Sequence, residues 1–153
     1  MRSALKQLVA DHFPQVAADI LQPLAQLLQQ ARALCGGDID KFVILMLIAL
    51  RMAQHREFRT ATPEKIGRGE LAILPSLGIN VRSIAESLGV PKETVRRKVN
   101  EMVAEGWVVR VERRLYVTAR AYHDLAPMRG DLETLMVRYH EIVVQLQSLG
   151  PRA

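Results

Sequence analysis

Residues 80–106 contain two short helical patterns separated by a glycine, and this run constrains the fold more than any other part of the chain. Asn80 is a favourable N-cap for the first pattern, and Gly89 can adopt the left-handed conformation that ends a helix. Pro91 can open the second pattern because the N–H that proline lacks has no partner at a helix start. Gly106 then ends it. Two short helices joined by a glycine-centred turn are typical of a helix-turn-helix.

The periodicity changes immediately after this run. Residues 107–118 read WVVRV, a polar ERR and LYVT, which predicts a short β-hairpin. Arg113 and Arg114 lie at the predicted tip and Arg110 lies nearby, placed to reach a phosphate or an adjacent minor groove. Trp107, at the start of the hairpin, is expected to be a core anchor. A helix-turn-helix followed directly by a basic hairpin is the order of a winged helix.

The predicted second helix, residues 91–105, separates an apolar face from a polar one when its residues are placed at 100° intervals. The apolar face contains Val95, Val99, Met102 and Val103. The polar face contains Glu93, Thr94, Arg97, Asn100 and Glu101, with Arg96 and Lys98 flanking it and Lys92 near the helix start. Arginine can pair bidentately with guanine, asparagine can pair with adenine, and glutamate can accept from cytosine. These residue types match what a DNA major groove requires.

The positive charge of the chain is concentrated in the same region. The whole chain has 21 Lys and Arg against 16 Asp and Glu, a net charge of +5. Residues 80–120 contain nine Lys or Arg against five Asp or Glu, so they hold +4 of it. A local positive charge of this kind suits a polyanionic partner.

The run IAESLGVPKETVRRKVNEMVAEGWV resembles the DNA-binding part of bacterial winged-helix regulators, especially the Crp–Fnr family, whose pattern is IA..LG...ETV.R....L...G.I. The resemblance covers roughly 40 of the 153 residues. It implies sequence-specific binding of double-stranded DNA by a transcriptional regulator, with Lys92, Glu93 and Arg97 at the bases. It does not imply the family's effectors, because no Gly-rich β-roll precedes the motif and the cysteines needed for an iron–sulfur cluster are missing.

The predicted DNA-binding set combines the polar face of the second helix with the hairpin. It consists of Lys92, Glu93, Thr94, Arg96, Arg97, Asn100, Arg110, Arg113 and Arg114. The alternative for the adjacent arginines is a solvated helix face. The alternative for the whole module is a winged helix that binds protein and has no duplex affinity. RNA binding ranks last, because the aromatic platforms and GXXG loop of common RNA modules are missing.

We predict a mostly α fold in three parts. Residues 1–37 form an N-terminal helical extension, residues 38–120 form the winged helix-turn-helix, and residues 121–153 form a C-terminal helix for dimerisation. Residues 59–79 interrupt the central part with an irregular, Pro- and Gly-rich insert. A flap, an extra DNA contact and a mobile insert all remain open for it.

Before the insert, two helices are expected. The first begins near Pro14, should be kinked or divided by Pro23, and ends at Cys35-Gly36-Gly37. Asp38 is a good N-cap for the second, which is expected to run to about Phe58.

After the hairpin, the chain is expected to turn helical, with a break at Pro127 and Gly130 and a last helix capped by Asp131. The apolar stripe of that helix contains Leu132, Leu135, Met136, Tyr139, Ile142, Val143, Leu146 and Leu149. Such a stripe exceeds what one small domain needs, so we predict a homodimer that places two recognition helices on half-sites about one helical turn apart. Packing of the stripe on the central domain is the alternative.

Composition argues against catalysis. Cys35 is the only cysteine, so one chain can form no intramolecular disulfide and no cysteine-based zinc cluster. The histidines, His12, His55, His123 and His140, lie at no metal-ligand spacing. The chain has no nucleotide-binding loop or nucleophile motif. We predict no enzyme activity, no cofactor and no metal, whereas a small-molecule effector stays unknown.

Residues 42–50, FVILMLIAL, are the one strongly apolar run. They are far short of the about 20 residues that span a bilayer, so we predict a buried helix and no membrane. The N-terminus lacks the apolar run of a signal peptide. A cytoplasmic location is therefore expected.

Overall fold

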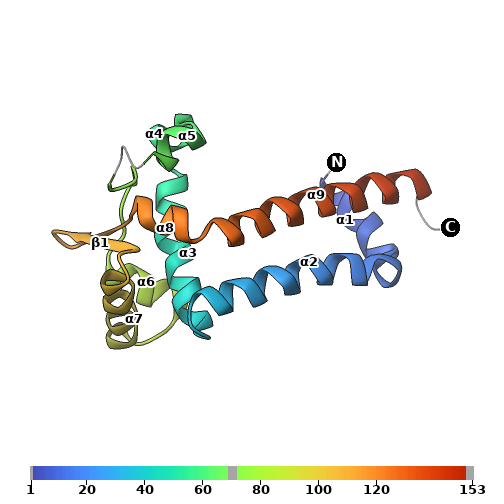
Figure 1. Ribbon diagram of the computed structural model, residues 1–153. Coiled ribbons are helices and arrows are strands. Elements are labelled where there is room, and N and C mark those ends of the chain that lie inside the picture. The colour runs from blue at the N-terminus through green and yellow to red at the C-terminus, as the bar shows by residue number, and fades with distance from the viewer. Residues whose placement is uncertain (1, 69–71, 151–153) are drawn as a thin grey trace. The chain divides into compact units, whose positions relative to one another are not determined.

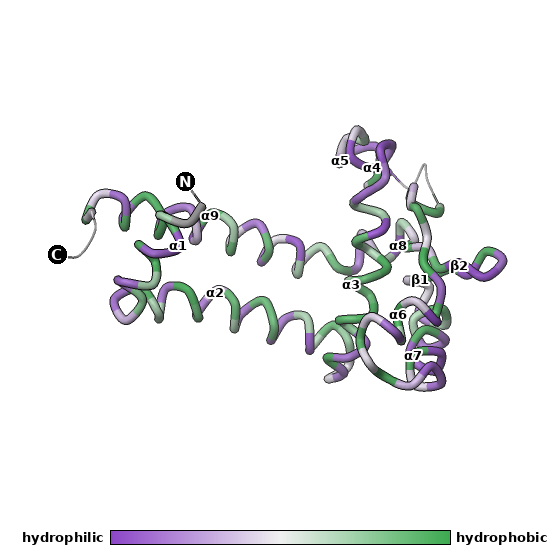
Figure 2. Tube along the Cα trace, turned by 180° about the vertical axis from the view of Figure 1, so that it is seen from behind, coloured by the Kyte–Doolittle hydropathy of each residue, from purple (hydrophilic) through white to green (hydrophobic). Residues whose placement is uncertain are grey.

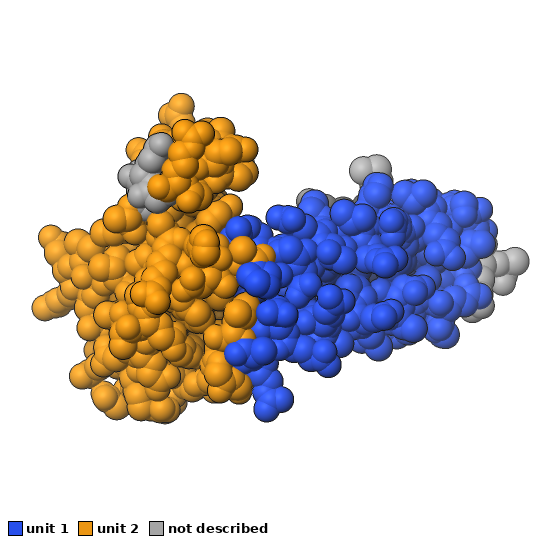
Figure 3. All heavy atoms as spheres, in the orientation of Figure 1, with its two compact units in different colours: residues 1–33, 127–153 blue, residues 34–126 orange. Residues whose placement is uncertain are grey.

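The computed structural model describes residues 2–68 and 72–150. It is mostly helical and contains a two-stranded antiparallel sheet (Figure 1), as the sequence predicted. The chain divides into two compact units (Figure 3): residues 34–126 form one, and residues 1–33 together with 127–153 form the other. We call them the central unit and the terminal unit. None of the described helices is long and apolar enough to cross a membrane.

The central unit contains the predicted helix pair and hairpin. Its helices are α3 (Ile39–Ala53), α4 (Arg56–Thr60), α5 (Pro63–Gly67), α6 (Val81–Leu88), α7 (Lys92–Ala104) and α8 (Ala119–Asp124). Its strands are β1 (Val108–Val111) and β2 (Arg114–Val117).

Local signals set the ends of α6 and α7 as predicted. The Asn80 side chain accepts a hydrogen bond from the Ser83 amide at 2.8 Å and so caps α6. Gly89 follows α6 with a φ of +65°, and Gly106 follows α7 with a φ of +79°. Both angles lie in the left-handed region that favours glycine. The predicted tight turn at Gly89, between the two helices, is therefore confirmed.

The hairpin pairs Val108 with Val117 and Val111 with Arg114, so its turn consists of Glu112 and Arg113. A further segment flanks β2, because the Leu115 amide donates to the Ile79 carbonyl at 2.8 Å and the Leu74 amide donates to the Val117 carbonyl at 3.0 Å. Part of the predicted irregular insert, residues 72–79, thus lies along β2.

The helix expected to run from Asp38 to about Phe58 is shorter than predicted. Asp38 caps it as expected, accepting from the Lys41 amide at 3.0 Å. However, α3 ends at Ala53 and a separate helix, α4, begins at Arg56. The cause is His55, which has extended backbone angles and accepts the Glu57 amide on its Nδ1 at 3.2 Å, as an N-cap does.

The core of the central unit combines the apolar run of α3 with the inner faces of α6, α7 and the hairpin. Its fully buried side chains include Ile44, Leu45, Ile48, Ile84, Val95, Val99, Met102 and Leu115. Trp107 is also buried, which confirms it as a core anchor, and its Nε1 donates to Asp124 Oδ2 at 3.0 Å. Two predictions on α7 are wrong: Val103 is 38% exposed, whereas Lys98 is only 7% exposed.

The terminal unit contains α1 (Arg2–Asp11), α2 (Phe13–Leu34) and α9 (Ala126–Leu149). Pro23 does not divide α2, which continues past it. The predicted break at Pro127 and Gly130 is also wrong, because α9 begins earlier and includes both residues. Proline is tolerated in the first turn of a helix, where its missing N–H has no partner. The expected cap, Asp131, lies inside α9 and accepts a hydrogen bond from Gln26 at 3.2 Å.

A small core joins the helices of the terminal unit. It contains Val16, Ile142 and Leu146, with Leu8, Val9, Ile20 and Tyr139 packed against them. Other apolar residues recur along α2 and α9 (Figure 2) and stay exposed. They include Leu21, Leu24 and Leu28 of α2, and Leu132, Met136, Val137, Val144 and Leu149 of α9.

Candidate nucleic-acid interface

The outer face of α7 presents the six helix residues of the predicted DNA-binding set. Lys92, Glu93, Arg96, Arg97 and Asn100 are exposed, and Thr94 is half-buried. The opposite face is held by Val95, Val99 and Met102, which are fully buried. Because the inner face is packed against the core, the outer face is presented by a helix that cannot rotate about its axis.

The hairpin places its three arginines differently. Arg110 of β1 lies beside α7, since its Nη2 donates to Asn100 Oδ1 at 3.1 Å. Arg113 lies in the hairpin turn and is exposed. Arg114 is not at the tip: it begins β2, and its Nη1 donates to the Leu77 carbonyl at 3.0 Å. The structure therefore joins Arg110 to the α7 surface and turns Arg114 toward the segment before α6.

Arg114 lines a pocket with a residue that sequence reasoning missed. Arg51, near the end of α3, donates from Nε to the Gly78 carbonyl at 3.1 Å. The pocket is lined by Arg51, Gly78, Ile79, Asn80, Ser83 and Arg114. A basic surface thus extends from the hairpin to the start of α6. The only signal in the sequence was the arginine directly after the apolar run of residues 42–50.

The arginines on α7 are held by ion pairs within the helix. Arg96 Nη2 lies 3.1 Å from Glu93 Oε2, and Arg97 Nη1 lies 3.5 Å from Glu101 Oε1. Exposed pairs of this kind contribute only about 0–1 kcal/mol. Each pair engages one terminal nitrogen of the arginine, so neither prevents the guanidinium group from binding a further partner.

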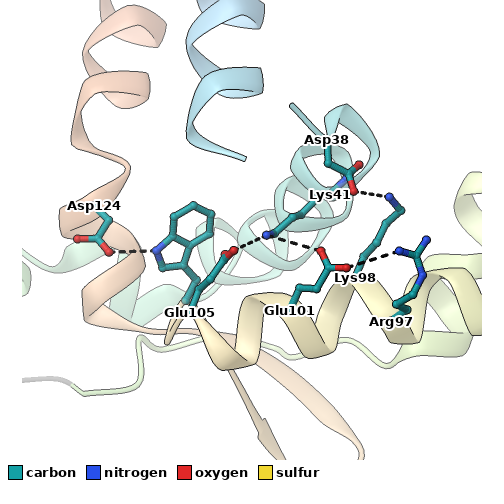
Figure 4. A network of polar contacts seen from close by, with 8 residues as sticks. Asp38, Lys41, Arg97, Lys98, Glu101, Glu105 and Asp124 are labelled. Atoms are coloured by element: carbon teal, nitrogen blue, oxygen red, sulfur yellow. Dashed lines mark hydrogen bonds and ion pairs between the residues drawn. The ribbon is translucent and has the colours of Figure 1, made fainter. Parts of the chain in front are cut away.

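Two buried lysines fix α7 to α3 (Figure 4). Lys98 of α7 pairs with the Asp38 carboxylate at the start of α3. Lys41 of α3 pairs with Glu105 and lies 3.8 Å from Glu101 Oε2. A buried ammonium is tolerated only when it is paired, so each contact restricts where α7 can lie. The sequence placed Lys98 beside the polar face and gave no sign of a role for Lys41, because their partners are about 60 residues away along the chain.

The contact with Lys98 also affects the pKa of the Asp38 carboxyl. Burial acts to raise its pKa, but hydrogen bonds from the Lys98 side chain and the Lys41 amide outweigh burial. The pKa of Asp38 therefore lies below its ordinary value. The folded state favours the charged carboxylate.

No protein-family model, curated protein or solved structure matches this chain.

Replacing Asp38 with Asn tests the contact through acid unfolding. Because the folded-state pKa of Asp38 is lowered, its contribution to stability is present above the ordinary value of 3.8 and is lost as the pH falls through the folded-state pKa. We expect Asp38→Asn to be less stable than the wild type at neutral pH, and the difference to shrink below pH 3.8. Urea unfolding at a series of pH values measures it. A stability difference that does not change with pH would contradict this account.

Proposed function

We propose that the central unit is a winged helix-turn-helix that binds double-stranded DNA by sequence and regulates transcription. In this proposal α7 enters the major groove and the hairpin contacts flanking DNA. The observation that carries the proposal is the exposed face of α7, where Arg97 and Asn100 lie on a helix packed rigidly against the core and Arg110 lies beside Asn100.

The chemistry of that face supports base reading. Arg97 is exposed, and its ion pair with Glu101 engages only Nη1, so the remaining N–H groups of the guanidinium can donate two hydrogen bonds to guanine. The Asn100 amide can pair with adenine, and its present partner, Arg110, can turn to a phosphate instead. Arg113 in the hairpin turn suits a phosphate contact that carries no sequence information.

A protein-interaction module is the second candidate function. The same face would then bind an acidic protein surface and show no affinity for duplex DNA. The concentration of positive charge in residues 80–120 fits both candidates. The pairing of bidentate donors on α7 with a basic hairpin favours DNA, because grooves and phosphates are read by these two kinds of contact.

Two arginine substitutions distinguish base reading from phosphate contact. Arg97→Ala should cost about 1–3 kcal/mol on the preferred duplex and relax the preference at one base pair. Arg113→Ala should weaken preferred and random duplexes alike and lower the salt slope by about one. Fluorescence anisotropy across a salt series measures both effects.

The control is Arg138→Ala, which removes an equally exposed arginine from α9 in the terminal unit and should leave both affinities unchanged. Equal losses on preferred and random duplexes for Arg97→Ala would show that Arg97 does not read bases.

We propose further that the terminal unit forms a homodimer. Hydrogen bonds join Gln26 to Asp131 and Tyr139 to the Ile20 carbonyl, so α2 and α9 run antiparallel. At 100° per residue, the exposed residues Leu21, Leu24 and Leu28 border the core face of α2, and Leu132 and Met136 border that of α9. For antiparallel helices, these two stripes emerge on the same side of the pair.

A second copy of the chain is the proposed occupant of that surface. The same patch on two copies can meet about a two-fold axis, as most homodimers do. Two copies would also present two α7 helices to a palindromic site with half-sites about one helical turn apart.

Introducing a charge into the apolar surface tests the dimer. Met136 is 75% exposed, and burying a methionine in an interface contributes about 1.5–3 kcal/mol. Met136→Lys should therefore weaken dimerisation by more than about tenfold. The control is Leu50→Lys, at an apolar residue of α3 that is 50% exposed, and it should remain dimeric. Sedimentation of the wild-type chain as a monomer at high concentration would contradict the proposal.

A further inference from the structure

Glu101 is held from two sides by cations of different kinds. Its Oε2 lies 3.8 Å from the Lys41 ammonium, and its Oε1 lies 3.5 Å from Arg97 Nη1. The Lys41 side chain is 6% exposed, whereas that of Arg97 is 64% exposed. One carboxylate therefore connects a buried cation to an exposed one (Figure 4).

Lys41 is fixed in its place by its surroundings. Its ammonium pairs with Glu105 and lies 5.9 Å from the centre of the Trp107 ring, where a cation is attracted by the π face. A buried ammonium cannot leave its partners without losing the interactions that offset desolvation. Lys41 thus provides a fixed positive charge beneath α7.

We propose that Lys41 and Glu101 are positioning residues that set sequence selectivity without contacting bases. Lys41 anchors Glu101, and Glu101 holds the Arg97 guanidinium in the orientation that pairs with a base. This inference rests on the proposed function, in which Arg97 reads a base. It adds two residues outside the predicted DNA-binding set.

The physical reason is preorganisation. An arginine side chain loses much rotamer freedom when both of its terminal nitrogens are fixed. If a neighbouring carboxylate restricts the guanidinium before binding, less freedom is lost on binding the correct base. Glu101 also bears a negative charge near the DNA, which disfavours contacts that do not satisfy Arg97.

Two other ion pairs of the central unit show what is particular to this arrangement. Arg96 pairs with Glu93, but the Glu93 side chain is 76% exposed, and among the described residues no buried cation pairs with it. Glu86 of α6 also pairs with an arginine one turn away, since its Oε1 lies 2.8 Å from Arg82 Nε, and both side chains are mostly exposed. Glu86 therefore matches Glu101 in charge and in its ion pair with an arginine but lies on another helix, which makes it the control.

The experiment compares Glu101→Gln, Lys41→Met and the control Glu86→Gln. The quantity measured is the ratio of affinities for the preferred duplex and for a duplex changed at the base pair that Arg97→Ala relaxes. One bidentate arginine–guanine pair discriminates about five- to 150-fold. We expect Glu101→Gln and Lys41→Met to lower the ratio by about two- to fivefold, since an exposed pair contributes about 0–1 kcal/mol.

Affinity for random duplexes separates positioning from loss of structure. Glu101→Gln removes a negative charge near the phosphates, so its affinity for random duplexes should stay equal or rise while selectivity falls. A variant that only loses structure would bind both duplexes more weakly, and to the same extent. Glu86→Gln should keep the wild-type ratio, and thermal unfolding of each variant shows what fraction of the protein is folded.

The outcomes also separate this inference from the function on which it rests. A wild-type protein that selects no duplex would overturn the proposed function and the inference together. A selective wild type, with the ratio unchanged in Glu101→Gln, would overturn only the positioning role. An equal loss of selectivity in Glu86→Gln would overturn it too, because the effect would then follow from removing any carboxylate that pairs with an arginine. Glu101→Gln carries the test if Lys41→Met fails to fold, since the Glu101 side chain is 43% exposed.

Discussion

The contact between Asp38 and Lys98 is the constraint on which the central unit depends. Asp38 caps α3 with one carboxylate oxygen and pairs with Lys98 of α7 through the other. One side chain therefore fixes both where α3 begins and where the middle of α7 lies. Since Lys98 is buried, loss of the pair would leave its ammonium buried without a counter-charge, which is strongly destabilising.

The second buried pair extends this constraint along α7. Lys41, one turn into α3, reaches Glu105 and Glu101 near the end of α7. Trp107 then leads from α7 into the hairpin and is tied to α8 through Asp124. The outer face of α7 and the hairpin are thus attached to one polar network, and this rigidity is what a base-reading surface requires.

Much of the central unit could be predicted because its signals are local. Asn80, Gly89 and Gly106 act on residues within one turn of themselves, and the change to period two marks the hairpin. The burial of Lys98 could not be predicted. Lys98 and Val103 lie at similar angles on either side of the apolar face of α7, so only a distant partner, Asp38, decides which one is buried.

Helix ends without glycine or proline were also hard to predict. The break after α3 depends on the His55 side chain accepting a hydrogen bond from the Glu57 amide. Histidine is not among the usual N-cap residues, so its presence does not predict this break. The start of α9 shows the opposite case. Pro127 predicts a break, but it lies in the first turn of α9, where a proline is compatible with a helix. The nine residues of the predicted DNA-binding set all lie in the central unit, but the turn of Arg114 toward Leu77 depends on a pairing across the sheet edge.

The most direct measurement is the binding of the wild-type chain to duplexes enriched from a random pool, at several salt concentrations. The account predicts one enriched family of duplexes, bound at least about 1,000-fold more tightly than random sequence, with log affinity falling linearly with log salt. No enrichment, together with no binding at low salt, would contradict it and favour the protein-interaction module.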